Sequence, residues 1–338
     1  MHLSFLRLTD EERRLYIEEA AGRRGVSSVM LEKDFWVSWM LGLLFGSRFA
    51  DVLVFKGGTS LSKVFRAIDR FSEDVDLSLS PEFLGLSIAE LSDASSRTQA
   101  AKWMERAEAA CGDAVRTQLG PELEQAIVEL LGQGPGRWLE FMIDPATNSP
   151  VLLFHYPTTQ PSGFDYLRRT VKLEFGSLTD QQPTGRHPIR PWIADILGDV
   201  FNDWHCDVVA LDVQRTFWEK ATILHVEYHR PTEKPMPERF SRHYADTAAL
   251  SAHEVASRAV DQHELRERVI NWKSRFFGSG WARYDLAKPG TFRLAPTAER
   301  EAALRRDYET MREMYLSEPA SFDAVLAVLR QLETRING

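Results

Sequence analysis

Two aspartates, Asp74 and Asp76, stand two positions apart in a short run of alternating polar and apolar residues. Side chains two apart on a β-strand project from one face, so both carboxylates share a face while Val75 and Leu77 point to the core. Carboxylates this close repel each other, which raises the pKa of one of them unless a cation lies between them. Mg²⁺ meets that need, because proteins bind it through one or two carboxylates together with substrate phosphates. An exposed, charged strand face is the structural alternative.

A glycine-rich turn lies within twenty residues of the aspartates and follows the apolar run 52–55. Its residues are Gly57, Gly58, Thr59 and Ser60. Glycines let backbone N–H groups and a helix amino terminus approach a phosphate closely. The spacing fits neither the P-loop nor the dinucleotide-binding motif. Taken alone, the turn is more simply explained as a tight strand-to-helix connection that needs glycine for a positive φ, but together with the aspartates it predicts a metal–phosphate site.

A third carboxylate is expected on a neighbouring strand, and Glu174 in the run 170–175 supplies one by the same alternation. Lys172 shares its face. Glu174 could complete a two-metal site or help to deprotonate an attacking hydroxyl, and Lys172 could neutralise phosphate charge. A cross-strand ion pair on the sheet surface is the alternative role for these two residues.

The elements that position these residues follow from changes in hydrophobic period along the chain. Residues 1–46 are expected to be helical and packed on the core, residues 47–213 alternate strand and helix patterns with a helical insertion near 87–132, and residues 214–338 form a carboxy-terminal helical domain. Strands are expected at 52–55, 74–79, 138–143, 151–156, 170–175 and 208–213. Helices are expected at 29–44, 60–68, 215–229, 238–249, 253–276, 298–316 and 320–335. The mixture predicts an α+β (α/β) core with a mixed sheet.

Composition limits the classes of function. The net charge of −8 does not favour broad contact with nucleic acid, so any such binding must be local. We find no long apolar run and no signal-peptide pattern, which predicts a cytoplasmic protein without a membrane partner. Cys111 and Cys206 lie far apart, which indicates neither a disulfide framework nor a zinc site.

The motifs together resemble the signature of the AbiEii/AbiGii abortive-infection toxins, a branch of the DNA polymerase β-like nucleotidyltransferase superfamily that also holds the MenT toxins. The segments that carry the resemblance are Glu32-Lys33-Asp34-Phe35-Trp36, Lys56-Gly57-Gly58-Thr59-Ser60-Leu61, Arg70-x-Ser72-x-Asp74-x-Asp76-Leu77, Lys172-Leu173-Glu174, Arg215-Thr216-Phe217-Trp218-Glu219-Lys220-Ala221 and Arg242-His243-Tyr244-x-Asp246. They span about residues 32–250. The family's usual Arg-Asp pair stands here as Arg242-His243, so the second member of the pair is replaced in this chain.

The resemblance implies a polymerase β-like nucleotidyltransferase core and a toxin of a type IV-like toxin–antitoxin or abortive-infection system. The implied reaction moves a nucleoside monophosphate from an NTP to an RNA 3′ end, with tRNA as the expected acceptor. Mg²⁺, or Mn²⁺ in its place, is the implied cofactor. A cognate antitoxin encoded nearby is the implied protein partner.

The resemblance also assigns roles to individual residues. Asp74, Asp76 and Glu174 are implied metal ligands and catalytic residues. Lys220 is implied to reach a phosphate, and Asp246 to orient it or assist the acceptor hydroxyl. The implied nucleotide-binding residues are Gly57, Gly58, Thr59, Ser60, Lys63, Lys172 and Arg242. Solvated charge at Lys220, and an Arg242–Asp246 pair within one helix, are the simpler alternatives.

Two other functions use the same residues. A phosphotransferase or a metal-dependent nuclease could employ the same carboxylates, and would transfer label from the γ-phosphate or shorten RNA. In a non-catalytic interaction module the acidic strand would be surface only, and the protein would not bind Mg²⁺-NTP.

Overall fold

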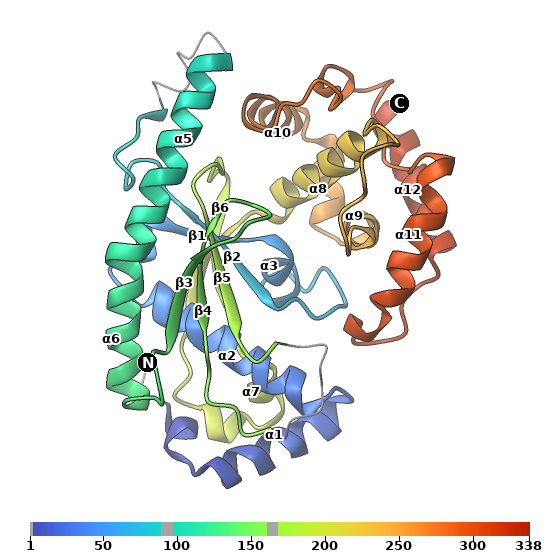
Figure 1. Cartoon of the computed structure of the whole chain (residues 1–338). Coiled ribbons are helices and arrows are strands. Elements are labelled where there is room, and N and C mark those ends of the chain that lie inside the picture. Colours follow the sequence, from blue (N-terminus) through green and yellow to red (C-terminus); the bar gives the residue numbers. More distant parts are fainter. Residues whose placement is uncertain (1–2, 89–96, 161–167) are drawn as a thin grey trace. The chain divides into compact units, whose positions relative to one another are not determined.

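The computed structural model of the chain describes residues 3–88, 97–160 and 168–338 (Figure 1). The chain divides into two compact units. Unit 1 consists of Met1–Val64 and Phe71–Leu211, and unit 2 consists of Phe65–Arg70 and Asp212–Gly338. The predicted division into domains 1–46, 47–213 and 214–338 stays a prediction. Among the described residues, no helix is long and apolar enough to cross a membrane.

Unit 1 is built on a seven-stranded sheet with the order β3-β4-β5-β2-β1-β7-β6. The strands are β1 (Leu53–Lys56), β2 (Asp74–Leu79), β3 (Leu139–Ile143), β4 (Pro150–Phe154), β5 (Val171–Gly176), β6 (Thr184–Pro188) and β7 (Asp207–Leu211). β2 pairs with β5 and β1 with β7 in parallel, whereas the other neighbours are antiparallel. The predicted mixed sheet is therefore confirmed. β6 was not predicted, because its sequence Thr-Gly-Arg-His-Pro lacks apolar alternation.

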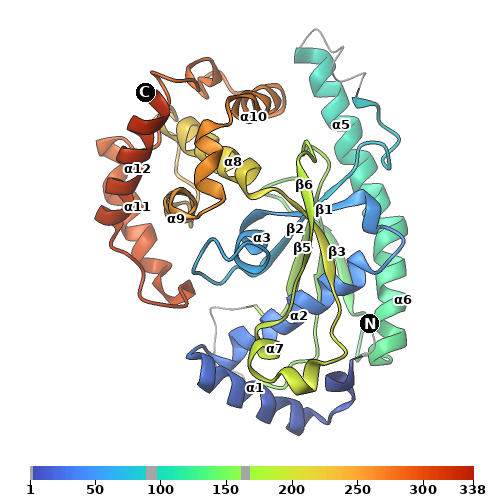
Figure 2. The same cartoon turned by 180° about the vertical axis from the view of Figure 1, so that it is seen from behind.

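The helices of unit 1 surround this sheet (Figures 1 and 2). They are α1 (Asp10–Arg24), α2 (Ser28–Phe45), α3 (Gly57–Lys63), α5 (Arg97–Ala114), α6 (Gly120–Leu131) and α7 (Trp192–Ile196). In α2 every residue after Ser28 is buried, including the three charged residues Glu32, Lys33 and Asp34. The helix predicted at 60–68 begins earlier and ends at Lys63, and Arg66 beyond it has a positive φ of 51°. The predicted insertion near 87–132 contains α5 and α6, and its residues 89–96 lie outside the described residues.

Unit 2 is helical. Its α-helices are α8 (Val213–Tyr228), α9 (Ser241–Ala252), α10 (His263–Phe276), α11 (Ala298–Thr310) and α12 (Phe322–Asn337). The single helix predicted at 253–276 is divided into a 3₁₀ helix, Ala256–Asp261, and α10, with non-helical dihedrals at Gln262 between them. The helix predicted at 298–316 likewise ends early, at Thr310.

The short segment Phe65–Arg70 belongs to unit 2 although its neighbours in the sequence belong to unit 1. Arg70 forms an antiparallel bridge with Tyr315, and the N–H of Leu316 donates to the carbonyl of Asp69 at 3.2 Å. No sequence pattern predicted this pairing, because it joins residues that are far apart in the chain.

Candidate active site

The acidic residues of β2 lie on one face of the sheet. Asp74 and Asp76 are partly exposed, whereas Val75 and Leu77 are fully buried. In the parallel β2–β5 pair, Asp74 stands opposite Lys172 and Asp76 opposite Glu174. The predicted facing of these side chains is confirmed, and so is the prediction that Glu174 lies on a neighbouring strand.

The pKa of Asp74 is raised by its surroundings on this acidic face. Burial, followed by the negative charges of Asp76 and Glu73, raises its pKa to about 6. Lys172 and Lys33 act in the opposite direction. The repulsion expected from the spacing of the two aspartates is therefore present, and a hard divalent cation bound here would relieve it.

Lys172 organises the carboxylates on the β5 side of this face. Its Nζ donates to Glu174 Oε2 at 2.7 Å and to Asp144 Oδ2 at 2.6 Å. Burial acts to lower the pKa of Lys172, but these hydrogen bonds outweigh it and the pKa is raised. Asp144 follows β3 and was missed by the sequence analysis. Its only sequence signal is a carboxylate directly after a strand, which is too common to identify a site.

The glycine turn lies directly against the carboxylate of Asp76. Gly57 has a φ of 77°, and a Cβ on it would lie 1.9 Å from Asp76 Oδ2. Lys56 pairs with Asp76 across the antiparallel β1–β2 pair. Glycine is needed here both for its backbone conformation and for space. Gly57 can therefore provide the positive φ of the turn and also lie beside the acidic pair.

The two hydroxyl residues of the turn bond within unit 1. Thr59 Oγ1 donates to the backbone carbonyl of Asp74 and lies 2.9 Å from Ser72 Oγ. Ser60 Oγ donates to the carbonyl of Gly57 at 3.0 Å. Both side chains are buried. Thr59 thereby joins the turn to the start of β2. Gly58 is the second residue of α3 and follows Gly57 directly.

Lys63 pairs with Asp34 of α2 and not with the carboxylates of the acidic face. Its Nζ lies 2.6 Å from Asp34 Oδ1, and both side chains are buried. The other oxygen of Asp34 accepts from the backbone N–H of Trp192 at 2.7 Å. Lys63 therefore takes part in a buried ion pair with α2, which the sequence analysis did not foresee.

Within unit 2, the predicted residues Lys220 and Asp246 come together. Asp246 accepts from Nε and Nη2 of Arg70 and from Nζ of Lys220, each at 2.8 Å, and is only 1% exposed. Burial acts to raise the pKa of Asp246, but the two cations hold it well below its usual range. The partners of Asp246 thus come from outside its own helix, and the intrahelical pair with Arg242 is not what anchors it.

Arg242 and His243 extend this cluster. Burial, together with the charges of Lys220 and Arg242, holds the pKa of His243 well below its usual value, so the ring is neutral. His243 stands where the motif that the sequence resembles has an aspartate, so this chain has an uncharged side chain at that position. Burial, with the charges of Arg70 and Arg242, lowers the pKa of Lys220 although Asp246 acts in the opposite direction. Three basic residues, Arg70, Lys220 and Arg242, nevertheless stand against the single carboxylate of Asp246 in this cluster, which favours an anion.

The metal-binding capacity of the site depends on few protein ligands. Among the described residues, no three His, Cys, Asp or Glu side chains are gathered so as to hold an ion by themselves. Mg²⁺ is commonly held by one or two carboxylates while waters and substrate phosphates supply the other ligands. Asp74 and Asp76, on one face and beside the glycine turn, fit that mode of binding.

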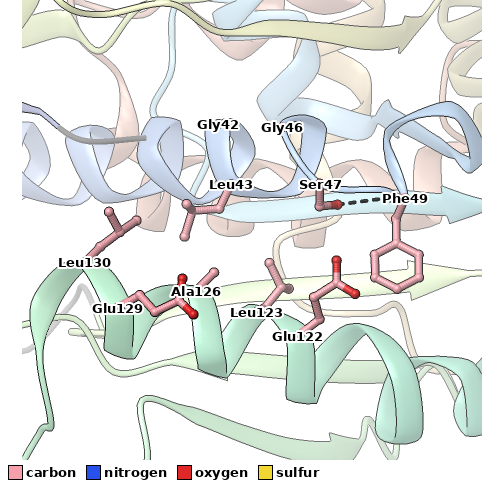
Figure 3. Close-up of a pocket in the computed structure, with 10 residues that line it drawn as sticks. All are labelled: Gly42, Leu43, Gly46, Ser47, Phe49, Glu122, Leu123, Ala126, Glu129 and Leu130. Atoms are coloured by element: carbon pink, nitrogen blue, oxygen red, sulfur yellow. Dashed lines mark hydrogen bonds between the residues drawn. The ribbon is translucent and has the colours of Figure 1, made fainter.

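A pocket elsewhere in unit 1 lies between α2 and α6 and has a volume of about 260 Å³ (Figure 3). Its walls are mixed, with one hydroxyl and two carboxylates beside the apolar lining residues. The lining residues are Gly42, Leu43, Gly46, Ser47, Phe49, Glu122, Leu123, Ala126, Glu129 and Leu130. The predicted site residues are not among them, so this pocket is separate from the acidic face.

Comparison with known proteins places the chain in a family. Residues 42–328 match the family described as nucleotidyl transferase AbiEii toxin of a type IV toxin–antitoxin system. Curated proteins provide no match. A solved structure of MenT4, a nucleotidyltransferase toxin from Mycobacterium tuberculosis H37Rv, has a TM-score of 0.50 and 16% sequence identity, over 97% of this chain and 89% of that chain. This likeness concerns the fold, whereas the family match covers most of the sequence. The chain belongs to the AbiEii family of nucleotidyltransferase toxins, and it is a nucleotidyltransferase.

Proposed function

We propose that this enzyme uses Mg²⁺, or Mn²⁺ in its place, to transfer a nucleoside monophosphate from an NTP to the 3′ end of an RNA, with tRNA as the acceptor. The observation that carries the proposal is the position of Asp76, which lies on one face with Asp74, opposite Glu174 and against Gly57. Such a face would join two metal-binding carboxylates to a turn whose glycine lets the Asp76 carboxylate lie directly against the backbone.

Asp74 and Asp76 would hold the metal ion, and Glu174 would be the third acidic ligand. When bound, Mg²⁺ supplies positive charge that screens the triphosphate and favours in-line displacement at the α-phosphorus. Lys172 already holds Glu174 and is positively charged, so it would neutralise phosphate charge on the β5 side. Gly57, which has no Cβ, would let the Asp76 carboxylate keep its position against the turn.

The transfer requires no reactant other than the RNA and the NTP. The 3′ oxygen of the RNA forms a bond to the α-phosphorus, the bond from that phosphorus to the bridging oxygen breaks, and pyrophosphate leaves. The proton of the attacking hydroxyl goes to a carboxylate, for which we propose Glu174.

For unit 2 we propose a phosphate-binding role. Lys220 and Arg242 would contact phosphate oxygens, and Asp246 would hold Lys220 in place through their 2.8 Å contact. The excess positive charge of this cluster supports the assignment. Lys63 is a weaker candidate for nucleotide binding, because Asp34 already pairs with it.

The biological setting follows from the family. A cognate antitoxin encoded nearby is the expected partner, and we propose that the toxin acts on RNA in the cytoplasm. The −8 net charge of the chain means that RNA contact is confined to local basic clusters.

The decisive experiment incubates the protein with Mg²⁺, total RNA and each of the four NTPs labelled at the α-phosphate, and then sequences RNA 3′ ends. We expect label to join RNA with the wild type and to fall to background with Asp76→Asn. Glu140→Gln, which removes an exposed carboxylate on β3, is the matched control and should retain activity.

The other outcomes identify the alternatives. Absence of transfer with all four NTPs would contradict the proposal. Label that moves from the γ-phosphate indicates a phosphotransferase, and shortened RNA indicates a nuclease. Failure to bind Mg²⁺-NTP would favour a non-catalytic module.

A further inference from the structure

Three consecutive charged residues are buried in the first half of α2. Glu32, Lys33 and Asp34 are 1%, 2% and 1% exposed. A buried charge costs several kcal/mol unless it is paired and hydrogen-bonded. Consecutive residues of an α-helix point about 100° apart, so the three side chains reach three different segments of unit 1.

The outer two residues hold connecting segments. Glu32 accepts from the hydroxyl of Thr158 at 2.6 Å and from the backbone N–H of Thr159 at 2.7 Å, in the segment after β4. Asp34 accepts from Lys63 and from the first N–H of α7, whose N-cap residue supplies no side-chain cap. Each carboxylate thereby satisfies donors of a segment that packs against α2: Thr158 and Thr159 are partly exposed, and Trp192 is buried.

The middle residue, Lys33, holds two strands at once. Its Nζ donates to Glu73 Oε2 at 2.5 Å and to the carbonyl oxygen of Arg168 at 2.8 Å. Glu73 directly precedes β2, and Arg168 lies three residues before β5. One ammonium group therefore fastens the entry points of the two adjacent parallel strands that carry the acidic face.

The contact with Glu73 also determines which way β2 faces. Glu73 directly precedes β2, so alternation continued by one residue puts it on the side of Val75 and Leu77, opposite to Asp74 and Asp76. A slip of one residue would turn every side chain to the other face. With Glu73 fastened to α2, the two aspartates must face away from α2.

The contact with Arg168 acts on the register. Asp76 stands opposite Glu174 only if β2 and β5 enter the sheet in step. Since Lys33 holds both entry points, it limits the sliding of one strand against the other.

We propose that Lys33 is a positioning residue of the nucleotidyltransferase, which sets the facing and register of β2 and β5 and so assembles Asp74, Asp76 and Glu174. The proposal rests on the proposed function of that acidic face. Lys33 acts through Glu73 and the Arg168 carbonyl and does not touch the substrate.

The test separates positioning from simple charge compensation. Lys33→Met leaves Glu73 without its ammonium partner, so we expect a loss of stability. In Lys33→Met/Glu73→Met both charges are gone, and the pair of apolar side chains should restore stability. We expect the double variant still to bind Mn²⁺ about 10- to 100-fold more weakly and to turn over more slowly, because the ligands are less well placed.

Three measurements are needed on the full chain: urea unfolding, Mn²⁺ affinity by electron paramagnetic resonance, and hydrogen exchange of the amides in β2 and β5. Glu32→Gln is the matched control, because Glu32 is equally buried on the same helical turn but bonds elsewhere. It should leave Mn²⁺ affinity and exchange in β2 and β5 unchanged.

The results distinguish the inference from the proposed function. Wild-type Mn²⁺ affinity and exchange in the double variant would show that Lys33 only compensates Glu73, and would overturn the inference. Equal losses in Glu32→Gln would overturn it as well. A wild type that binds no Mn²⁺ contradicts the proposed function instead, and exchange in β2 and β5 then still decides the role of Lys33.

Discussion

At the scale of single residues, Gly57 meets a conformational requirement of the turn and a spatial requirement of the acidic site. From the sequence alone these are two alternative explanations of the glycine. Its φ of 77° is the conformation that a strand-to-helix turn requires, and its missing Cβ leaves the space that Asp76 Oδ2 occupies. The first requirement concerns the backbone and the second concerns the site. A larger residue would fail both.

Gly57→Ala should therefore displace Asp76 as well as strain the turn. We expect a stability loss of about 1–2 kcal/mol from the left-handed backbone, together with weaker Mn²⁺ binding because the new Cβ collides with the carboxylate. Urea unfolding and Mn²⁺ titration measure the two effects.

Gly22→Ala is the control for this prediction. Gly22 lies in α1, and a Cβ on it meets nothing within 4 Å. This change should be neutral or slightly stabilising, since alanine favours a helix by about 1 kcal/mol over glycine. Unchanged Mn²⁺ affinity in Gly57→Ala would refute the close approach to Asp76.

At the scale of elements, the starts of α7 and α9 are capped by carboxylates that belong to other helices. The N-cap residue of α9, Phe240, provides no side-chain cap. Asp307 of α11 instead accepts from the backbone N–H groups of Arg239 and Ser241, at 2.7 and 2.8 Å. α9 carries Asp246, so this cap helps to fix the cationic cluster of unit 2.

Asp307→Ala should cost about 1–2 kcal/mol of stability, because two N–H groups lose their acceptor. Asp307→Asn keeps one carbonyl oxygen where Asp307 uses both carboxylate oxygens, so its loss should be intermediate. Urea unfolding, with hydrogen exchange at Ser241, measures the series. Equal stability in Asp307→Ala and the wild type would show that the cap contributes nothing.

The local pattern of apolar and polar residues predicted most helices and strands. It gave no prediction for elements whose sequence lacks such a pattern. Alternation identified β2 and β5 and the facing of their polar residues. β6 has no alternation and was missed. Helix ends were less well predicted, because a break such as the one at Gln262 depends on the packing of the neighbouring segments more than on propensity.

At the scale of the whole molecule, unit 2 is assembled from two separate parts of the chain. The segment Phe65–Arg70 contributes the guanidinium that Asp246 needs, across a separation of 176 residues. The polypeptide therefore passes from unit 1 to unit 2 and back before it reaches β2. Unit 2 therefore includes a residue that lies only four positions before Asp74.

Arg70→Met should destabilise unit 2 strongly. It leaves Asp246 buried with Lys220 as its remaining cation, and breaking a buried ion pair costs about 3–5 kcal/mol. Thermal and urea unfolding of the full chain measure this loss.

Arg66→Gln is the control, since Arg66 lies in the same segment but is exposed. It should change stability by less than about 0.5 kcal/mol. If the two variants lose the same stability, the Arg70–Asp246 contact is not what holds the segment in unit 2.

The sequence by itself determined the acidic face and the glycine turn, because strand alternation and glycine conformation operate over a few residues and need no knowledge of the fold. It also placed the chain in its family, since those local motifs occur in a characteristic order. The tertiary structure alone decided the partners: Lys63 with Asp34, Asp246 with Arg70, and Lys33 with the entries of β2 and β5. These choices depend on which buried charges must compensate one another, and that is a property of the packed chain as a whole.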